Sequence, residues 1–282
     1  MNILTIDVEE WFHLLDFDAT RTEAEWRNYE VRIYDNVERL FRILDDTDTR
    51  ATFFIVGWIA KNYPDLVRRI ADKYQIGSHT MNHQLVWQQT PQAFRNDVEQ
   101  GVKLLEDITG KKVECFRAPG FSIRETESWA FEILAELGIH YDCSVFPGRH
   151  AHGGMSTYSS AEPAVIEHGA VSMKEFPVSY KSILGRHVIF SGGGYFRLFP
   201  YWLIKRWTKE SEGYLMSYIH PRDLDAGQPV LKGLPLSRRF KSYVGLKGAE
   251  RKLQQWLADF QFVDILTADR QTEWAAVQHV RL

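Results

Sequence analysis

Residues 51–78 read ATFFIVGWIAKNYPDLVRRIADKYQIGS. Residues 51–56 form an apolar run of strand length, and residues 64–73 carry apolar side chains at helical spacing. A brief second strand is predicted at residues 75–78. A strand, a helix and a strand in this order indicate a β-α-β unit, in which the two strands run parallel.

The same alternation continues in both directions along the chain. Further strands are expected at residues 2–6, 113–116, 139–143, 171–178, 214–219 and 262–266. Helices are expected at residues 37–44, 90–105, 129–137, 200–210 and 253–260. Thr90 is the expected N-cap of the helix at residues 90–105, with Pro91 at its first helical position. We therefore expect an α/β fold built as one domain over residues 1–282, with insertions around 147–170 and 223–248 that lack clear periodicity.

The composition is typical of a soluble globular protein. The chain has 282 residues, 34 Lys and Arg against 37 Asp and Glu, and a net charge of −3. This near-neutral balance argues against broad nucleic-acid binding, which requires a basic surface. No run approaches the ~18 apolar residues of a membrane span, so a membrane association would be peripheral. The first residues do not resemble a signal peptide and the two cysteines are expected to be free thiols, so we expect a cytoplasmic protein.

Reactive polar side chains follow several of the predicted strands directly. They are Asp7, Glu9, His79, His83, Arg117, Asp142 and His220. In a parallel barrel the carboxyl ends of the strands meet on one face, where the loops build active sites. We therefore expect these side chains, which are distant in sequence, to share one pocket.

Two of these motifs indicate a metal site. Alternation along an extended strand places Asp7 and Glu9 on the same side, although a solvated acidic turn explains the segment equally well. On a helical turn, the spacing of His79 and His83 brings two imidazoles onto one face; capping or surface histidines are the alternative. Two histidines and one of these carboxylates leave coordination room for water, as catalytic zinc sites require. Asp142 is a further candidate carboxylate.

Arg117 and His220 have structural interpretations as well. Arg117-Ala118-Pro119-Gly120 follows a strand, and its Pro and Gly are typical of a loop with a tight turn. Alternatively, Arg117 is a buried guanidinium that orients a catalytic carboxylate. His220 ends a strand where the chain must turn, and a lone His there is usually structural. Arg117 or His220 becomes a catalytic candidate if it lies in the same pocket as the side chains of the other motifs.

The motifs, taken in order, resemble the polysaccharide deacetylase family, also called the NodB-homology or carbohydrate esterase 4 domain. The matching segments are Thr5-Ile6-Asp7-Val8-Glu9, Gly77-Ser78-His79-Thr80-Met81-Asn82-His83, Phe116-Arg117-Ala118-Pro119-Gly120 and Ser217-Tyr218-Ile219-His220. Residues 7–13, 175–177 and 192–197 further resemble the subgroup associated with bacterial exopolysaccharide and surface-polysaccharide gene clusters. The resemblance implies a distorted (β/α)7 barrel that removes acetyl groups from sugars with the help of a divalent metal.

The family assigns a role to each matching position. Asp7 matches the general base, Arg117 the residue that orients it, and His220 the general acid. His79 and His83 match metal ligands. The resemblance therefore implies one catalytic centre assembled from all four motifs.

The first motif departs from the common family pattern of two adjacent Asp residues, because Val8 stands where the second, metal-binding Asp is expected. By analogy with D-x-D variants, Glu9 is the expected third ligand, and Glu10 stays open as an alternative. Zinc is the expected metal, with Co²⁺, Ni²⁺ or Mn²⁺ as alternatives.

The implied reaction is removal of an N-acetyl group from an amino sugar in a polysaccharide, an oligosaccharide or a glycan precursor. Pro119, Phe121, Asp142 and Tyr195 are the expected substrate-binding residues; a backbone N–H near Phe121 or Asp142 is expected to help stabilise the oxyanion. The alternatives are a deformylase of a formamido sugar and a non-catalytic carbohydrate-binding relative. The sugar, its linkage and the oligomeric state are left open.

Overall fold

The computed structural model describes residues 1–15, 17–148, 152–158, 160–183, 185–211 and 213–282. The chain forms two compact units. Unit 1 consists of Met1–Ala51 and Tyr180–Val263, and unit 2 consists of Thr52–Ser179 and Asp264–Leu282. Among the described residues, no helix is both long and apolar enough to cross a membrane.

Unit 1 is built on two parallel strands, β1 (Asn2–Val8) and β10 (Leu215–Ile219), with Ile6 opposite Ile219. Strand β1 is buried from its second residue to its last. A two-stranded hairpin is formed by β8 (Lys181–Ile183) and β9 (Arg186–Val188). The helices are α1 (Glu23–Trp26), α2 (Ile33–Asp46), α7 (Gly193–Leu198), α8 (Tyr201–Glu210), α9 (Leu236–Tyr243) and α10 (Leu246–Asp259).

Apolar faces hold the helices of unit 1 in place. Val37, Leu40 and Leu44 of α2 are almost completely buried, at the spacing the sequence shows. Trp256 of α10 packs its ring 5.1 Å from that of Phe196 in α7, measured between centroids. Burying each such large apolar side chain stabilises the folded state by about 1.5–3 kcal/mol.

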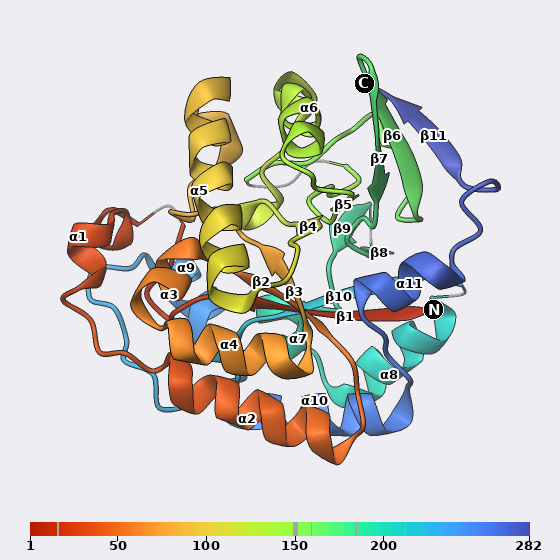
Figure 1. Cartoon of the computed structure of the whole chain (residues 1–282). Helices are drawn as coiled ribbons and strands as arrows, with labels where there is room; N and C mark the ends of the chain where they lie inside the picture. The colour runs from red at the N-terminus through yellow and green to blue at the C-terminus, as the bar shows by residue number, and fades with distance from the viewer. Residues whose placement is uncertain (16, 149–151, 159, 184, 212) are drawn as a thin grey trace. The chain divides into compact units, whose positions relative to one another are not determined.

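Unit 2 contains a sheet with the strand order β2-β3-β4-β5-β7-β6-β11 (Figure 1). The strands are β2 (Thr52–Ile55), β3 (Gln75–Ser78), β4 (Cys115–Phe116), β5 (Tyr141–Asp142), β6 (Ala164–His168), β7 (Val171–Glu175) and β11 (Gln278–Arg281). Strands β2 to β5 and β7 are parallel, and β6 runs antiparallel to β7. The helices are α3 (Gly57–Asn62), α4 (Pro64–Lys73), α5 (Pro91–Thr109), α6 (Trp129–Glu136) and α11 (Ile265–Gln271).

The α/β class and the parallel β-α-β unit at residues 51–78 are confirmed, and α4 and β3 have the predicted bounds. The strand predicted at residues 262–266 is wrong. Only Val263 makes a strand-like bridge, to Ile3, and Asp264 then caps α11 by accepting from Thr267 N at 2.7 Å. An Asp before a short apolar run therefore starts a helix here rather than continuing a strand.

The two predicted insertions contain regular structure. The 147–170 segment holds β6, and residues 149–151 and 159 of it lie outside the described part of the chain. The 223–248 segment holds α9 and the start of α10. The single domain over residues 1–282 stays a prediction.

Candidate functional site

In unit 1, the register of β1 and β10 brings Asp7 and His220 to the same sheet edge. Ile6 and Ile219 are paired, so Asp7 and the residue after Ile219 leave their strands side by side. His220 Nε2 lies 3.9 Å from Asp7 Oδ2 and 3.8 Å from Glu9 Oε1. Asp7 and Glu9 are 3% and 8% exposed, which excludes the solvated acidic turn.

A turn, rather than an extended strand, brings the two carboxylates of the first motif together. Strand β1 ends at Val8, and the backbone N–H of Glu9 donates to the carbonyl of Asp7 at 3.0 Å. The expected continuation of the strand is therefore corrected. Both carboxylates nevertheless face His220 Nε2.

Asp223 holds the opposite side of the His220 ring. Asp223 Oδ2 lies 3.0 Å from His220 Nδ1 and accepts from the backbone N–H of His220 at 2.9 Å. Arg197 Nε lies 2.9 Å from the other oxygen of Asp223. Because a carboxylate can only accept, Nδ1 carries a proton and the ring is oriented with Nε2 toward Asp7 and Glu9.

The charges of this cluster shift its protonation equilibria. Burial disfavours the imidazolium, but Glu9 and Asp223 outweigh burial and raise the pKa of His220 to about 9. Burial also opposes the charge of Asp223, yet Arg197 and His220 hold the pKa of that carboxyl well below its usual range. The ring is therefore charged over the neutral pH range when Asp7 and Glu9 are ionised.

Glu10 serves a different element. Its Oε1 accepts from Arg32 N at 2.7 Å and from Ile33 N at 2.9 Å, at the N-terminus of α2. Its Oε2 accepts from Trp11 N at 3.2 Å. Burial raises the pKa of Glu10 to about 7 against these hydrogen bonds. With its oxygens occupied by backbone donors, Glu10 is a helix cap, and Glu9 is the carboxylate that faces His220.

In unit 2, His79 follows β3, and its ring centroid lies 5.2 Å from that of His83. The predicted helical turn is wrong, because Thr80 and His83 have φ values of +63° and +53°. A loop with two left-handed residues brings the rings together instead.

Two neighbouring helices explain why this loop is not helical. Asp97 of α5 accepts from Met81 N at 2.8 Å and from Asn82 N at 3.2 Å, so these N–H groups do not bond within the loop. The carbonyls of Thr80 and Met81 accept from the first N–H groups of α3, at 2.8 and 2.9 Å. Gly57 allows this approach, because a Cβ there would lie 2.9 Å from Met81 Cα.

Arg117 supports the same histidine through its backbone. His79 Nδ1 lies 2.7 Å from the carbonyl oxygen of Arg117. A carbonyl only accepts, so Nδ1 carries the proton and the neutral ring has its lone pair on Nε2. The Arg117 side chain is 1% exposed, and its guanidinium donates from Nε to Cys143 O at 3.2 Å and stacks 4.5 Å from the Phe54 ring centroid. The buried-guanidinium interpretation is therefore supported over a simple loop turn.

Asp142 and Glu175 form a buried carboxyl pair at the ends of β5 and β7. They are opposite one another in the register and are both 0% exposed. Ser144 donates to both oxygens of Asp142, at 2.6 and 3.0 Å, and Val145 N donates to Glu175 Oε1 at 3.1 Å. Burial, and then the charge of Asp142, raise the pKa of Glu175 well above its usual value. Glu175 Oε2 is buried and meets no donor among the described residues, which favours the protonated form of this carboxyl.

The expected substrate-binding residues differ in exposure. Pro119 and Phe121 begin and end a turn of 3-10 helix after β4 and are buried, and Phe121 has a φ of +53°. Asp142 is fully buried, whereas Tyr195 in α7 is 42% exposed. Sugar contact by these residues stays a prediction.

Sequence reasoning missed three residues that support this chemistry. Asp223 follows His220 by three residues, the spacing of a capping interaction, and this signal could have found it. Arg197 and Glu175 lie in segments 192–197 and 175–177, whose resemblance to the exopolysaccharide subgroup implies no role for either residue. Their buried partners, Asp223 for Arg197 and Asp142 for Glu175, are distant in sequence, so residue spacing does not predict these pairs.

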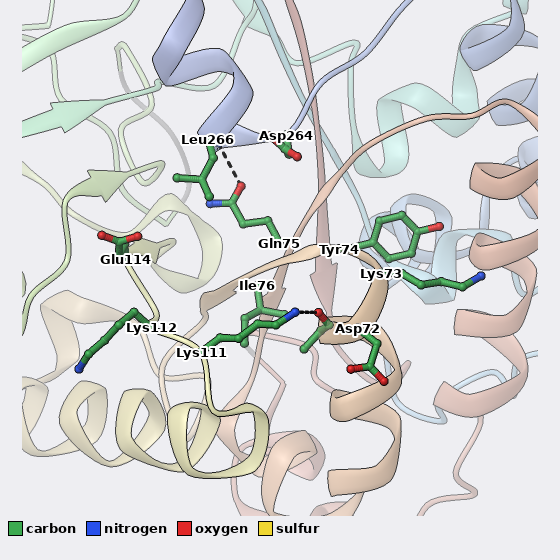
Figure 2. A pocket seen from close by; sticks show the side chains of 11 residues that line it. Asp72, Lys73, Tyr74, Gln75, Ile76, Lys111, Lys112, Glu114, Asp264 and Leu266 are labelled. Carbon is green, nitrogen blue, oxygen red and sulfur yellow. Dashed lines mark hydrogen bonds between the residues drawn. The ribbon is translucent and has the colours of Figure 1, made fainter.

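A cavity of about 410 Å³ lies elsewhere in unit 2 (Figure 2). It borders Gln75, the first residue of β3, whereas His79 follows the last residue of that strand. Figure 2 shows Gln75 pointing toward Leu266, whose N–H donates to Gln75 Oε1 at 3.1 Å. Lys111 donates to the carbonyl of Ala71. These side chains connect elements at the amino end of β3, whereas His79 follows its carboxyl end.

The donor chemistry fits a divalent cation. In unit 1, Asp7, Glu9 and His220 each offer a ligand atom, and these atoms lie within 4.8 Å of one another. In unit 2, the hydrogen bond from His79 Nδ1 fixes the tautomer that metal-bound histidines use. A mixed set of imidazole and carboxylate donors suits zinc and neighbouring transition metals.

Comparisons with known proteins agree with the motifs. Residues 17–141 match the model described as polysaccharide deacetylase, and residues 143–269 match that of a domain of unknown function, DUF3473. A peptidoglycan-N-acetylglucosamine deacetylase of Bacillus cereus is 32% identical over 81 residues, which are 28% of this chain and 30% of that protein. A chitooligosaccharide deacetylase of Azorhizobium caulinodans is 35% identical over 94 residues, which are 33% of this chain and 42% of that one. The matches thus span less than half the length of these curated relatives.

A solved structure shares the fold over the whole chain. It is a Mycobacterium smegmatis protein assigned to the polysaccharide deacetylases, with a TM-score of 0.69 and 18% identity, and the match covers 100% of this chain and 92% of that one. The ordered motifs, the α/β fold and the match over residues 17–141 agree with one another. Residues 17–141 therefore match the polysaccharide deacetylase family.

Proposed function

We propose that this protein is a metal-dependent deacetylase that hydrolyses the N-acetyl group of an amino sugar within a glycan. One observation carries the proposal: His220 Nε2 faces two buried carboxylates while Asp223 holds Nδ1. Such an arrangement supplies a base and an acid within reach of one amide bond. The names of the two curated relatives, both deacetylases of N-acetylated glycans or oligosaccharides, support this substrate class.

Glu9, His79 and His83 are the proposed ligands of the cation. Glu9 is favoured over Glu10 because the oxygens of Glu10 accept from the backbone at the start of α2. When bound, a divalent cation polarises the acyl carbonyl and makes water more acidic. Zinc is the proposed metal.

The chain's own residues move the protons. Asp7 accepts a proton from the attacking water, and His220 donates one from Nε2 to the leaving amine. Asp223 keeps the His220 ring in the orientation that this transfer needs. Arg117 is proposed to orient Asp7. The products are acetate and the free amino sugar.

The subgroup associated with exopolysaccharide and surface-polysaccharide synthesis is our proposal for the biological setting. Its support is the sequence of residues 7–13, 175–177 and 192–197. Within these segments, Glu175 and Arg197 both occupy buried polar clusters, which is a structural reason for these residue types.

Acetate release from N-acetylglucosamine oligomers and related N-acetylated glycans tests the proposal, with bound zinc measured on the same sample. Asp7→Asn is expected to retain the metal and lose at least about 100-fold in turnover, since it removes the base. His79→Ala is expected to lose the metal as well as turnover. The reverse pattern would overturn these roles.

The same assay separates the alternatives. Formate release from formamido sugars, without acetate release from acetamido sugars, would make the enzyme a deformylase. Binding of glycans by metal-loaded protein without release of either acid, across the whole panel, would make it a non-catalytic relative.

A further inference from the structure

A basic segment without carboxylates follows the catalytic motif of unit 1. The 24 residues from 226 to 249 contain no Asp or Glu. They contain the five cations Lys232, Arg238, Arg239, Lys241 and Lys247. The chain as a whole has a net charge of −3, so positive charge is concentrated here against the overall balance.

Large apolar side chains are exposed in the same segment. Leu236 and Phe240, one helical turn apart on α9, are 83% and 56% exposed, and Val230 is 48% exposed. These are three of the seven large hydrophobic side chains exposed among the described residues. Helix α9 has no buried residue, so its apolar face is not used in the core of unit 1.

The apolar and basic groups lie on one surface. Leu236, Arg239, Phe240, Tyr243 and Val244 line a shallow hollow. Lys232 and Lys241 are exposed nearby in sequence, and neither these lysines nor Arg239 ion-pairs with a residue that the structure describes. We call Lys232, Leu236, Arg239, Phe240 and Lys241 the α9 surface.

Helix α9 is tethered to unit 1 at both ends, although it is not buried. Near its start, Arg238 donates to the carbonyl of Leu15. At its end, the Arg197 guanidinium donates to the carbonyls of Lys241, Ser242 and Val244, at 2.9–3.1 Å. The same guanidinium pairs with Asp223, so one buried Arg joins the α9 surface to the support of His220.

We propose that the α9 surface docks the protein on a membrane whose lipids are anionic. A short helix with exposed apolar side chains and basic neighbours lies in the headgroup region, where Leu236 and Phe240 enter the acyl boundary and the cations approach lipid phosphates. The positive charge of the α9 surface favours an anionic membrane over a second copy of the chain as its binding partner. A two-fold contact through the same face would place its cations opposite one another.

Vesicle sedimentation tests the inference with the full chain. Vesicles of phosphatidylcholine are compared with vesicles of phosphatidylcholine and phosphatidylglycerol, at low and at raised salt. We expect binding to the anionic vesicles alone, and weaker binding as salt rises, because each cation near the surface contributes about fivefold in affinity. Equal binding to both vesicle types, or binding to neither, overturns the proposal.

Paired variants locate the surface. Leu236→Ser with Phe240→Ser, and separately Arg239→Glu with Lys241→Glu, are each expected to weaken vesicle binding by more than about tenfold. Controls change exposed residues on other helices. Trp202→Ser on α8 removes one large exposed apolar side chain, and Arg42→Glu with Arg68→Glu on α2 and α4 makes the same change in net charge as the Arg239 and Lys241 pair.

The controls should bind vesicles as the unaltered protein does. Equal loss in the Arg42 and Arg68 variant would show that net charge, not the α9 surface, governs binding, and would overturn the proposal. So would concentration-dependent dimerisation abolished by the Leu236 and Phe240 changes, because the occupant would then be a second copy. Melting temperatures confirm folding of every variant. Asp7→Asn should bind vesicles normally, which separates this inference from the proposed function.

Discussion

Glu175 and Asp142 face each other in the core, and the structure accommodates them by keeping a proton on Glu175. In the unfolded chain that proton is lost near the ordinary pKa of Glu. The stability that Glu175 contributes is therefore fully present below this ordinary pKa and is lost as pH rises through the raised value of the folded state. Glu175→Gln mimics the protonated form, since the amide still donates to Asp142 and accepts from Val145.

We expect the melting temperature of Glu175→Gln, relative to the unaltered protein, to rise progressively as pH increases above the ordinary pKa of Glu, because only the unaltered protein loses the stability of the protonated form. Glu167→Gln on the neighbouring strand β6 is the control, because His279 and Arg281 lower the pKa of Glu167 instead. A pH-independent difference for Glu175→Gln would show that both carboxyl groups are ionised in the fold.

At the scale of single residues, the sequence predicts which residues form the candidate site, but not which partners their side chains face. Asp7, Glu9 and His220 were identified by their place after strands, and the parallel register explains why that reasoning works. The sequence does not tell which of Glu9 and Glu10 is the metal ligand. Glu10 is identified as a helix cap by its hydrogen bond from Arg32 N, and no sequence pattern predicts that contact. Contacts between buried side chains from distant segments produce no periodic pattern in the sequence, so they cannot be predicted from it.

The loop between β3 and α5 is an element whose shape is set by its neighbours. Asp97→Ala removes the acceptor of the N–H groups of Met81 and Asn82 and of the Asn82 side chain. Hydrogen bonds to a charged group are worth about 1.5–3 kcal/mol each, and part is recovered by water, so we expect a loss of about 3 kcal/mol in the free energy of unfolding. His83 should then lose its position, and zinc affinity should fall.

Thr90→Ala on the same helix is the matched control. Thr90 caps α5 by accepting from Ala93 N at 3.2 Å, as the sequence predicts. Its loss should cost about 1 kcal/mol of stability without a change in zinc affinity. Denaturant unfolding and zinc titration check both variants. If Asp97→Ala bound zinc with unaltered affinity, the loop would not depend on α5 for its shape.

Elements with strong local signals were predicted well, whereas those set by tertiary contacts were not. Helix α4 begins at Pro64 and carries a regular apolar stripe, so its bounds follow from the sequence. The segment 79–83 has a helical spacing of histidines, but Asp97 and the N-terminus of α3 take its backbone groups. Competition for backbone hydrogen bonds is invisible to a spacing rule.

At the scale of the whole molecule, the proposed ligands are separated by up to 74 residues, from Glu9 to His83. An unfolded chain does not hold such ligands together, so metal binding is linked to folding. We expect zinc in large excess over its dissociation constant to raise the melting temperature, with a gain of about 4 kcal/mol at a thousandfold excess. A chelator should reverse the shift.

Two carboxyl-to-amide variants in adjacent positions sharpen this prediction. Glu9→Gln should abolish most of the zinc-induced shift, because an amide is a poor ligand for the cation. Glu10→Gln should retain the shift, because an amide oxygen can still accept from Arg32 N and Ile33 N at the start of α2. A retained shift in Glu9→Gln together with a lost shift in Glu10→Gln would exchange their roles. Because the two side chains differ by one position, this pair distinguishes coordination from helix capping at nearly constant local sequence.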